Sequence, residues 1–293
     1  MGVVFITWRS RLRNEKRELL SLWEAGSYNE AFELSGRNLE TNPMDYFLLR
    51  VHGFSAYQLA VAQINNFDTL RFIDECIWSL RKALLAADSA RDGGLYYVLG
   101  KAYYYKGPGY ADLAVRFLEE ARRAAYNAGD IPEYLGLAYA AIRDFRNSVA
   151  AFSLALDPAD SQLGADPSGA YGEEGGIPAD LLLLSIARSY IALGEQDTAR
   201  AYLVRCMETS RDANAVITAR LLLGGIFMET GGLAEAEAQY LAVLEMDEEN
   251  AEAHFQLGEL YVLGGDPTRA RAEWRRAVRI DPAHGPARAR LNM

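Results

Sequence analysis

Cysteine is scarce in this sequence, and its scarcity excludes two kinds of small scaffold. Cys76 and Cys206 are the only cysteines among 293 residues. Neither belongs to a CxxC motif or to another spacing typical of metal ligands, and two cysteines cannot build a disulfide framework. Because such cysteines behave as small apolar residues, we expect both thiols to be buried. This cysteine usage is compatible with a reducing compartment.

Positive charge is also in short supply. The chain carries 30 Lys and Arg against 40 Asp and Glu, which gives a formal net charge of −10. Proteins that bind nucleic acid neutralise its phosphates with clustered cations. The charge balance therefore argues against DNA or RNA, and we expect no nucleic-acid partner.

Long hydrophobic runs are missing as well. A helix that crosses a bilayer needs about 20 apolar residues, and the N-terminal apolar run, residues 2–8 (GVVFITW), is much shorter. Basic residues follow this run instead of preceding it, which is the reverse of a signal peptide. Two interpretations stay open. Either the run packs as a first segment of a cytoplasmic protein, or it ends an upstream anchor of a membrane-anchored or periplasmic protein whose partner lies in a membrane complex.

Catalytic signatures are absent from the sequence. It contains no GxxxxGK[ST] phosphate loop, no GxGxxG turn, no HExxH helix and no GxSxG elbow. The three histidines, His52, His254 and His284, are scattered and have no Cys, Asp or Glu at ligand spacing. We therefore expect no catalytic residue, no metal and no cofactor, and we interpret the chain as not being an enzyme.

What the sequence does contain is a repeat. Shifting residues 257–282 back by 34 places small residues on small ones and large residues on large ones: Gly258 on Gly224, Tyr261 on Phe227, Ala270 on Ala236 and Trp274 on Tyr240. A further shift by 37 gives another copy at 187–206. Looser copies occupy 22–43, 99–121 and 135–158, and a pair with longer helices is expected between 45 and 87.

Each copy is predicted to form two helices. In the last copy the apolar residues at helical spacing end at Gly264–Gly265, a pair typical of a C-terminal cap. Asp266 then offers an N-cap, Pro267 fits the first turn, and Asp281–Pro282 ends the second helix. The small residues let the two helices approach closely, while the large ones fill the space beside the crossing. One pair cannot bury its apolar stripe alone, so we expect neighbouring pairs to stack as a solenoid.

The pattern L-G-x-x-Y, then Ala, an aromatic residue, Ala and Pro, at a 34-residue period, resembles the tetratricopeptide repeat. The match is close at 251–284, except that His254 replaces the usual Trp. At 217–250 only the final Pro is lost, to Glu248. The resemblance is strong from 180 to 284 and weak from 12 to 158. It implies an all-α fold, a right-handed α-solenoid of about seven helix pairs.

We expect the chain to have four parts: an N-terminal segment (1–11), divergent repeats (12–158), a Gly/Pro-rich loop (159–179), and C-terminal repeats with a short tail (180–293). The stretch 157–178 contains five Gly and three Pro and cannot form a regular helix. We interpret it as a surface linker, as a recognition loop with Tyr171 as its anchor, or as a joint between an N-terminal and a C-terminal half.

In the tetratricopeptide family the first helix of each pair lines a concave surface that holds a peptide or a partner helix. The resemblance implies this role for Tyr97, Lys101, Tyr104, Tyr105, Tyr134, Leu137, Leu184, Arg188, Leu222, Met228, Phe255 and Glu259. The set is mostly apolar and aromatic, which suits the apolar face of a helix or peptide. Individual members would alternatively pack into the neighbouring repeat. The run YYVLGKAYYY (96–105) is the strongest candidate, because its five tyrosines must occupy more than one helix face.

The expected function is that of a non-enzymatic scaffold or adaptor that binds a protein or peptide partner in this groove. An alternative is a component of a transport or sensing system that binds a small hydrophobic ligand in the hollow of the solenoid. Self-association is a further hypothesis, since residues 269–290 carry seven Arg and the preceding copy is acidic at Glu235, Glu237, Glu245, Asp247, Glu248 and Glu249.

Overall fold

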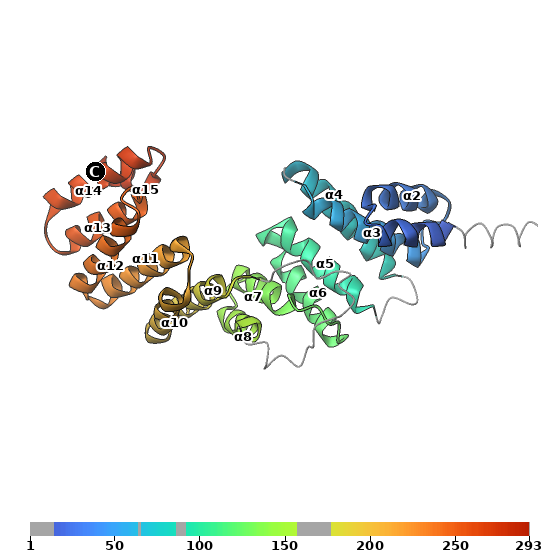
Figure 1. Ribbon diagram of the computed structural model, residues 1–293, viewed down its shortest axis with the longest axis horizontal. Helices are drawn as coiled ribbons and strands as arrows, with labels where there is room; N and C mark the ends of the chain where they lie inside the picture. The colour runs from blue at the N-terminus through green and yellow to red at the C-terminus, as the bar shows by residue number, and fades with distance from the viewer. Residues whose placement is uncertain (1–14, 64–65, 86–91, 157–176, 293) are drawn as a thin grey trace, which may run out of the picture. The chain divides into compact units, whose positions relative to one another are not determined.

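The computed structural model of the chain describes residues 15–63, 66–85, 92–156 and 177–292, and these residues form helices and connecting turns (Figure 1). The chain divides into two compact units, which are described separately. Unit 1 comprises residues 1–151 and 158–174, and unit 2 comprises residues 152–157 and 175–293. The expected N-terminal segment (1–11), most of the expected loop (159–179) and Tyr171 lie outside the described residues.

The first described element of unit 1 is a helix over residues 15–24. Its further elements are α2 (Tyr28–Thr41), α3 (Tyr46–Val61), α4 (Asn66–Ala83), α5 (Gly93–Lys106), the short 3-10 helix η2 (Pro108–Tyr110), α6 (Ala111–Arg123), α7 (Ile131–Ala141) and the first part of α8 (Phe145–Leu156). Helices α3 and α4 pack as a pair, and so do α5 and α6. Among the first helices of successive pairs, α5 also contacts both α3 and α7.

Unit 2 repeats this plan. Its elements after the end of α8 are α9 (Ala179–Ala192), α10 (Gln196–Thr209), α11 (Ala213–Thr230), α12 (Leu233–Met246), α13 (Ala251–Leu263), α14 (Pro267–Ile280) and α15 (Gly285–Leu291). The pairs are α9 with α10, α11 with α12, and α13 with α14, and α11 contacts both α9 and α13. The expected all-α solenoid of stacked helix pairs is confirmed within each unit.

The alternation of small and large residues has the predicted cause. A Cβ atom added to Gly53, Gly100 or Gly224 would lie 2.5–2.6 Å from the side chain of Leu80, Leu118 or Tyr240 on the second helix of the same pair. Gly258 stands equally close to the indole of Trp274. Each glycine therefore marks the point where two helices cross with no room for a side chain.

The turn of the last repeat forms as predicted. Helix α13 ends at Leu263, and Gly265 adopts a left-handed φ of 79°. The side chain of Asp266 accepts a hydrogen bond from the backbone N–H of Arg269 and so caps α14, which begins at Pro267. In the turn between α7 and α8 the corresponding left-handed residue is Arg143, at φ 63°. An L side chain is strained there, so this turn departs from the glycine pattern.

The expectation that both thiols are buried is confirmed. Cys76 and Cys206 are free cysteines with no exposed surface. Burial raises the pKa of the Cys76 thiol, and burial with a smaller effect of Asp180 raises that of Cys206. Both groups therefore stay protonated near neutral pH and act as apolar filling.

Candidate functional site

The tyrosines of α5 occupy two faces of that helix. Tyr96 and Tyr103 stack on the ring of Phe117 in α6, at centroid distances of 6.4 Å and 5.5 Å. These two rings therefore belong to the packing inside the helix pair. Tyr97, Tyr104 and Tyr105 instead contact residues of the neighbouring repeats.

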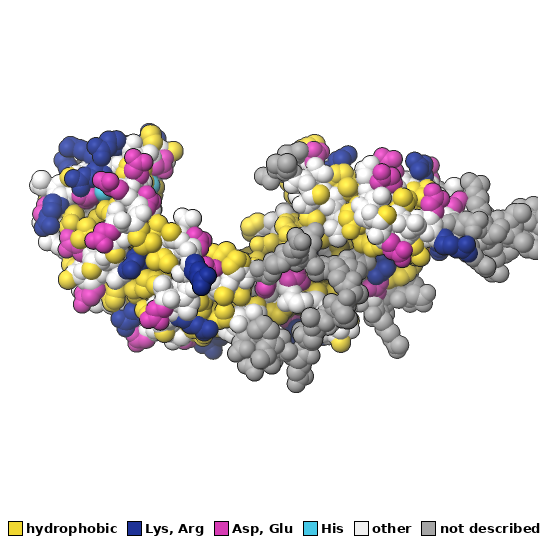
Figure 2. Space-filling view, viewed as in Figure 1, with side chains coloured by type: hydrophobic (Ala, Val, Ile, Leu, Met, Phe, Trp, Pro, Cys, Tyr) yellow, Lys and Arg dark blue, Asp and Glu magenta, His cyan; other side chains and the backbone are white. Residues whose placement is uncertain are grey.

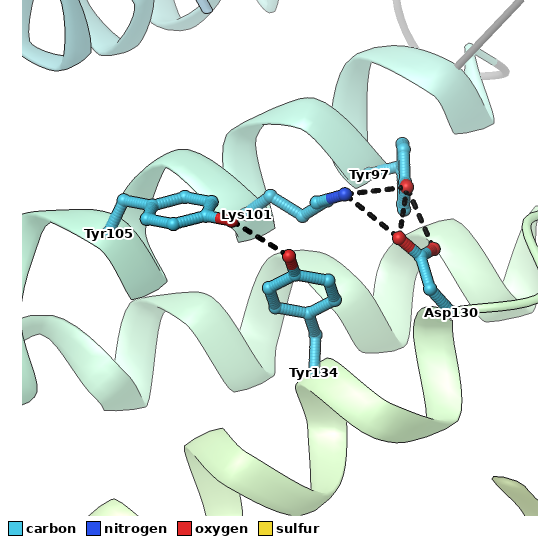
Figure 3. A network of polar contacts seen from close by, with 5 residues as sticks. All are labelled: Tyr97, Lys101, Tyr105, Asp130 and Tyr134. Carbon is cyan, nitrogen blue, oxygen red and sulfur yellow. Dashed lines mark hydrogen bonds and ion pairs between the residues drawn. The ribbon is translucent and has the colours of Figure 1, made fainter. Parts of the chain in front are cut away.

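Four tyrosines from three successive first helices form one cluster. Tyr104 packs edge-on against Tyr105 and Tyr134, at centroid distances of 5.6 Å and 5.2 Å. Tyr57 of α3 lies 6.2 Å from Tyr105. The hydroxyls of Tyr105 and Tyr134 are 2.9 Å apart and share a hydrogen bond (Figure 3). We call Tyr57, Tyr104, Tyr105 and Tyr134 the tyrosine cluster.

A buried ion pair lies beneath the cluster. The ammonium of Lys101 donates to Asp130 at 2.8 Å and to the hydroxyl of Tyr97 at 3.0 Å. That hydroxyl in turn donates to both carboxylate oxygens of Asp130, each 2.7 Å away (Figure 3). The ammonium also sits 4.4 Å from the centre of the Tyr134 ring, close enough for a cation–π interaction. Asp130 precedes α7, so the pair ties α5 to the next first helix.

Four phenols of this region are held neutral. Burial, with Asp130 close by, raises the pKa of Tyr97 far above its usual value. Burial and the hydrogen bond with Tyr105 do the same for Tyr134, and burial also raises the pKa of Tyr57 and of Tyr104. Tyr57, Tyr104 and Tyr134 therefore offer neutral hydroxyl groups beside the ring faces of the cluster, which suits binding better than proton transfer.

The same link joins the other first helices of unit 1, and sequence reasoning missed it. A cation on one first helix reaches the aspartate at the start of the next: Lys16 to Asp45 at 2.8 Å, Arg50 to Asp92 at 2.6 Å, and Lys101 to Asp130 at 2.8 Å. Two of these aspartates also cap their helix by accepting a backbone N–H. The signal in the sequence was an Asp before each of these helices, paired with a cation on the preceding first helix.

The candidate residues of unit 1 divide into a surface layer and a buried layer. Tyr105 is 39% exposed, and Tyr104, Tyr134 and Leu137 are half-buried. Tyr97 and Lys101 are only 1% and 4% exposed. The expectation that these two line the groove directly needs correction, because their polar ends are used in the pair with Asp130.

The candidate residues of unit 2 do not gather into a comparable cluster. Leu184 is 3% exposed and belongs to the core, so it too is corrected from surface to interior. Arg188 is exposed, whereas Leu222 and Met228 are half-buried and Met228 accepts the hydroxyl of Tyr240 at 3.2 Å.

The last two candidates, Phe255 and Glu259 of α13, contact the end of the chain. The ring of Phe255 lies 5.1 Å from that of His284, and Glu259 forms an ion pair with Arg290 of α15. Helix α15 therefore occupies part of the surface that the sequence assigned to a partner. The short tail expected after the last repeat is this helix.

Two absences hold within the described residues. No group of three or more His, Cys, Asp or Glu side chains there is placed to hold a metal ion. Across the same ranges, none of the helices has the length and apolar character that a bilayer crossing requires.

Comparison with known families and structures agrees with the helix-pair geometry. Two models described as tetratricopeptide repeat match residues 182–212 and 221–284, the part of the chain where the repeat pattern is strongest. No curated protein matches the sequence.

Solved structures share the fold over 82–97% of this chain at low identity. The C-terminal part of a TPR repeat-containing protein from Cytophaga hutchinsonii is 15% identical, with a TM-score of 0.61 over 95% of this chain and 100% of that one. The apo form of the quorum sensor NprR from B. thuringiensis is 11% identical, with a TM-score of 0.60 over 97% and 80%. The type IV pilus biogenesis factor PilW is 17% identical, with a TM-score of 0.57 over 82% and 98%. The two model matches, together with the 34-residue repeat and the stacked helix pairs, show that this chain contains tetratricopeptide repeats, over residues 182–212 and 221–284.

Proposed function

We propose that the chain is a non-enzymatic scaffold that binds a protein or peptide partner on the tyrosine cluster of unit 1. The observation that carries this proposal is the cluster itself. Aromatic rings from three successive first helices converge there, and Tyr105 remains 39% exposed at its surface. Tyrosine is enriched among the residues that dominate binding energy at protein interfaces, because it combines a large apolar ring with a polar tip.

The cluster is organised before any partner arrives. The Tyr105–Tyr134 hydrogen bond and the edge-on contacts of Tyr104 restrict the rotamers of all three rings. Immobilising a flexible side chain at an interface costs about 0.5–1.5 kcal/mol, and a side chain that is already fixed avoids most of that cost. The half-buried Leu137, one helical turn from Tyr134, extends the apolar surface along α7. The surface therefore suits an uncharged, apolar stretch of an extended peptide or the apolar face of a helix.

A peptide library displayed on phage and selected against the whole chain tests this proposal. The affinity of a selected peptide is then measured by fluorescence anisotropy for the wild type and for the variant Tyr104→Ala with Tyr105→Ala. Truncating two interface tyrosines costs more than about 1 kcal/mol each, so the double variant should bind at least about 30-fold more weakly. Tyr110→Ala is the matched control, because Tyr110 is similarly exposed but lies in η2, outside the cluster.

Two results would overturn the proposal. One is a set of selected peptides that bind the double variant as tightly as the wild type, with unchanged helicity and melting in both. The other is an apolar fluorescent dye that binds the wild type with one-to-one stoichiometry, does not bind the double variant, and is not displaced by any library peptide. That result would favour the alternative function, in which the chain binds a small hydrophobic ligand.

A further inference from the structure

Charge is divided sharply within the last two repeats of unit 2. Residues 221–268 contain ten Asp and Glu and no Lys or Arg. Residues 269–293 contain seven Arg against two acidic residues. The boundary falls just after α14 begins, so α12 carries negative charge and α14 carries positive charge. In Figure 2 the Lys and Arg side chains gather over α14, near the C-terminus.

The two charges occupy equivalent positions on equivalent helices. At the 34-residue period, Glu237 corresponds to Arg271, Leu241 to Arg275, and Glu245 to Arg279. Each set has a spacing of four residues, so each forms a row along one side of its helix with about 6 Å between neighbours. The second helices of two successive repeats thus present matching rows of opposite sign.

These rows face away from the core of the unit. Leu241 is 45% exposed, and Glu245, Arg271, Arg275 and Arg279 are exposed as well. Within the described part of the chain, no hydrogen bond or ion pair engages these four charged side chains. Glu237 is half-buried and accepts the hydroxyl of Tyr261 at 2.8 Å, which leaves its second oxygen free.

We propose that unit 2 forms a two-fold symmetric dimer in which α12 of each copy lies antiparallel against α14 of the other. In the antiparallel register, Glu245 meets Arg271 of the second copy, Leu241 meets Arg275, and Glu237 meets Arg279. Because of the two-fold symmetry, each of these contacts occurs twice in the dimer. The aliphatic stem of Arg275 covers Leu241 while its guanidinium stays in water, as long basic side chains commonly do.

A second copy of this chain would contact both charged rows, whereas an unrelated acidic partner would contact only one. A two-fold interface uses the same patch on both subunits, so that patch must contain both signs and each sign must match the other in spacing. The two rows meet this condition, because they are one repeat apart on the same unit. An acidic partner would use only the arginine row and leave the acidic row and Leu241 uncovered.

The surface is short and carries exposed charges, and both features point to a weak dimer. Helices α12 and α14 have 14 residues each, which gives a length of about 21 Å. Two such faces make a footprint smaller than the about 800 Å² per partner of a standard interface. We therefore expect a weak dimer whose dissociation constant rises with ionic strength, since exposed charges are screened at high salt.

Sedimentation velocity on the whole chain tests the proposal. The measurement is made at increasing protein concentration and at two salt concentrations. The Debye length is about 30 Å at about 0.01 M salt and about 3 Å at about 1 M salt. Arg271→Glu and Glu245→Arg should each weaken the dimer by at least about tenfold, because each replaces two attractive contacts with two repulsive ones. The two substitutions combined in one chain should restore it, because the symmetric contact then has its signs exchanged. Arg205→Glu and Glu208→Arg, at exposed positions of α10, are the matched controls and should leave it unchanged.

Four results would overturn the proposal. A chain that stays monomeric at low salt and the highest concentration has no such dimer. A dimer that neither single reversal weakens uses another surface. A combined variant that stays as weak as the single ones shows that position 245 does not meet position 271. Binding of polyglutamate that Arg271→Glu abolishes, in a monomeric chain, would assign the arginine row to an acidic partner instead.

Discussion

The buried pair of Lys101 and Asp130 allows the sharpest test of how unit 1 is held together. We consider the substitution Asp130→Ala. It removes both oxygens that accept hydrogen bonds from Lys101 and Tyr97. The ammonium, whose side chain is 6% exposed, is left with one phenol hydroxyl and nearby ring faces. An uncompensated buried charge of this kind costs about 3–5 kcal/mol.

The reciprocal substitution, Lys101→Met, should cost less. The Asp130 side chain is 19% exposed, so its carboxylate keeps access to water and also keeps the hydroxyl of Tyr97. Methionine fills much of the volume of the lysine stem without a charge. The expected loss is that of a charged hydrogen bond, about 1.5–3 kcal/mol. The difference between the unfolding free energies lost in the two single variants therefore shows which partner of the ion pair is the more deeply buried.

The variant that carries both substitutions completes a double-mutant cycle. It buries no charge, so its loss should be smaller than the sum of the two single losses by about 1–3 kcal/mol. Urea unfolding followed by circular dichroism gives the free energies. Hydrogen exchange of α5 and α7 shows whether the loss is local, because stacked repeats can unfold stepwise. Equal and additive losses below about 1 kcal/mol, the value for exposed pairs, would refute the reasoning.

Three further predictions concern single positions. Gly224→Ala should destabilise unit 2 by about 1–3 kcal/mol, because the new Cβ would lie 2.5 Å from the Tyr240 ring. At the adjacent Gly225 a new Cβ meets open space, so Gly225→Ala should stabilise α11 by about 0.5–1 kcal/mol in the same urea assay. Burial lowers the pKa of His52 below its usual 6.5, so the unfolded state takes up the proton first. Stability should therefore decline as pH falls below about 6.5, and His52→Asn should flatten that part of a plot of melting temperature against pH. Arg143→Gly should raise stability by about 0.5–1 kcal/mol by relieving the left-handed φ of 63°, and an unchanged melting temperature would contradict this.

The helix pairs and their turns were predictable because their causes are local in sequence. Gly258 and Trp274 are 16 residues apart and belong to one repeat, so the small and large residues that must fit together recur at each period. The cap at Asp266 depends on the next three residues alone. Such signals survive in a single sequence, and the family matches fall on the residues where they are clearest.

The layers of the candidate site were not predictable in the same way. The register of the repeat indicated that Tyr97, Lys101, Tyr104 and Tyr105 lie on the first helix, but not which of them reach the surface. Burial of Lys101 depends on Asp130, 29 residues away in the next repeat, and on how closely α7 approaches α5. A lysine on a helix is ordinarily solvated, so only the position of the neighbouring helix identifies it as interior.

The buried layer has a consequence for binding that the surface layer alone would not suggest. Lys101 and Asp130 fix the position of α7 against α5, and those two helices carry Tyr134 and Tyr105. The distance between the hydroxyls of Tyr105 and Tyr134 is therefore set by an ion pair that a partner on the surface does not touch. A phenylalanine cluster could offer the same ring area, but it would lose the hydroxyl bond that fixes the rings to one another. In the proposed binding mode, specificity for a partner depends on charge beneath the surface as much as on the rings above it, and Lys101→Met should weaken peptide binding even though the tyrosines remain.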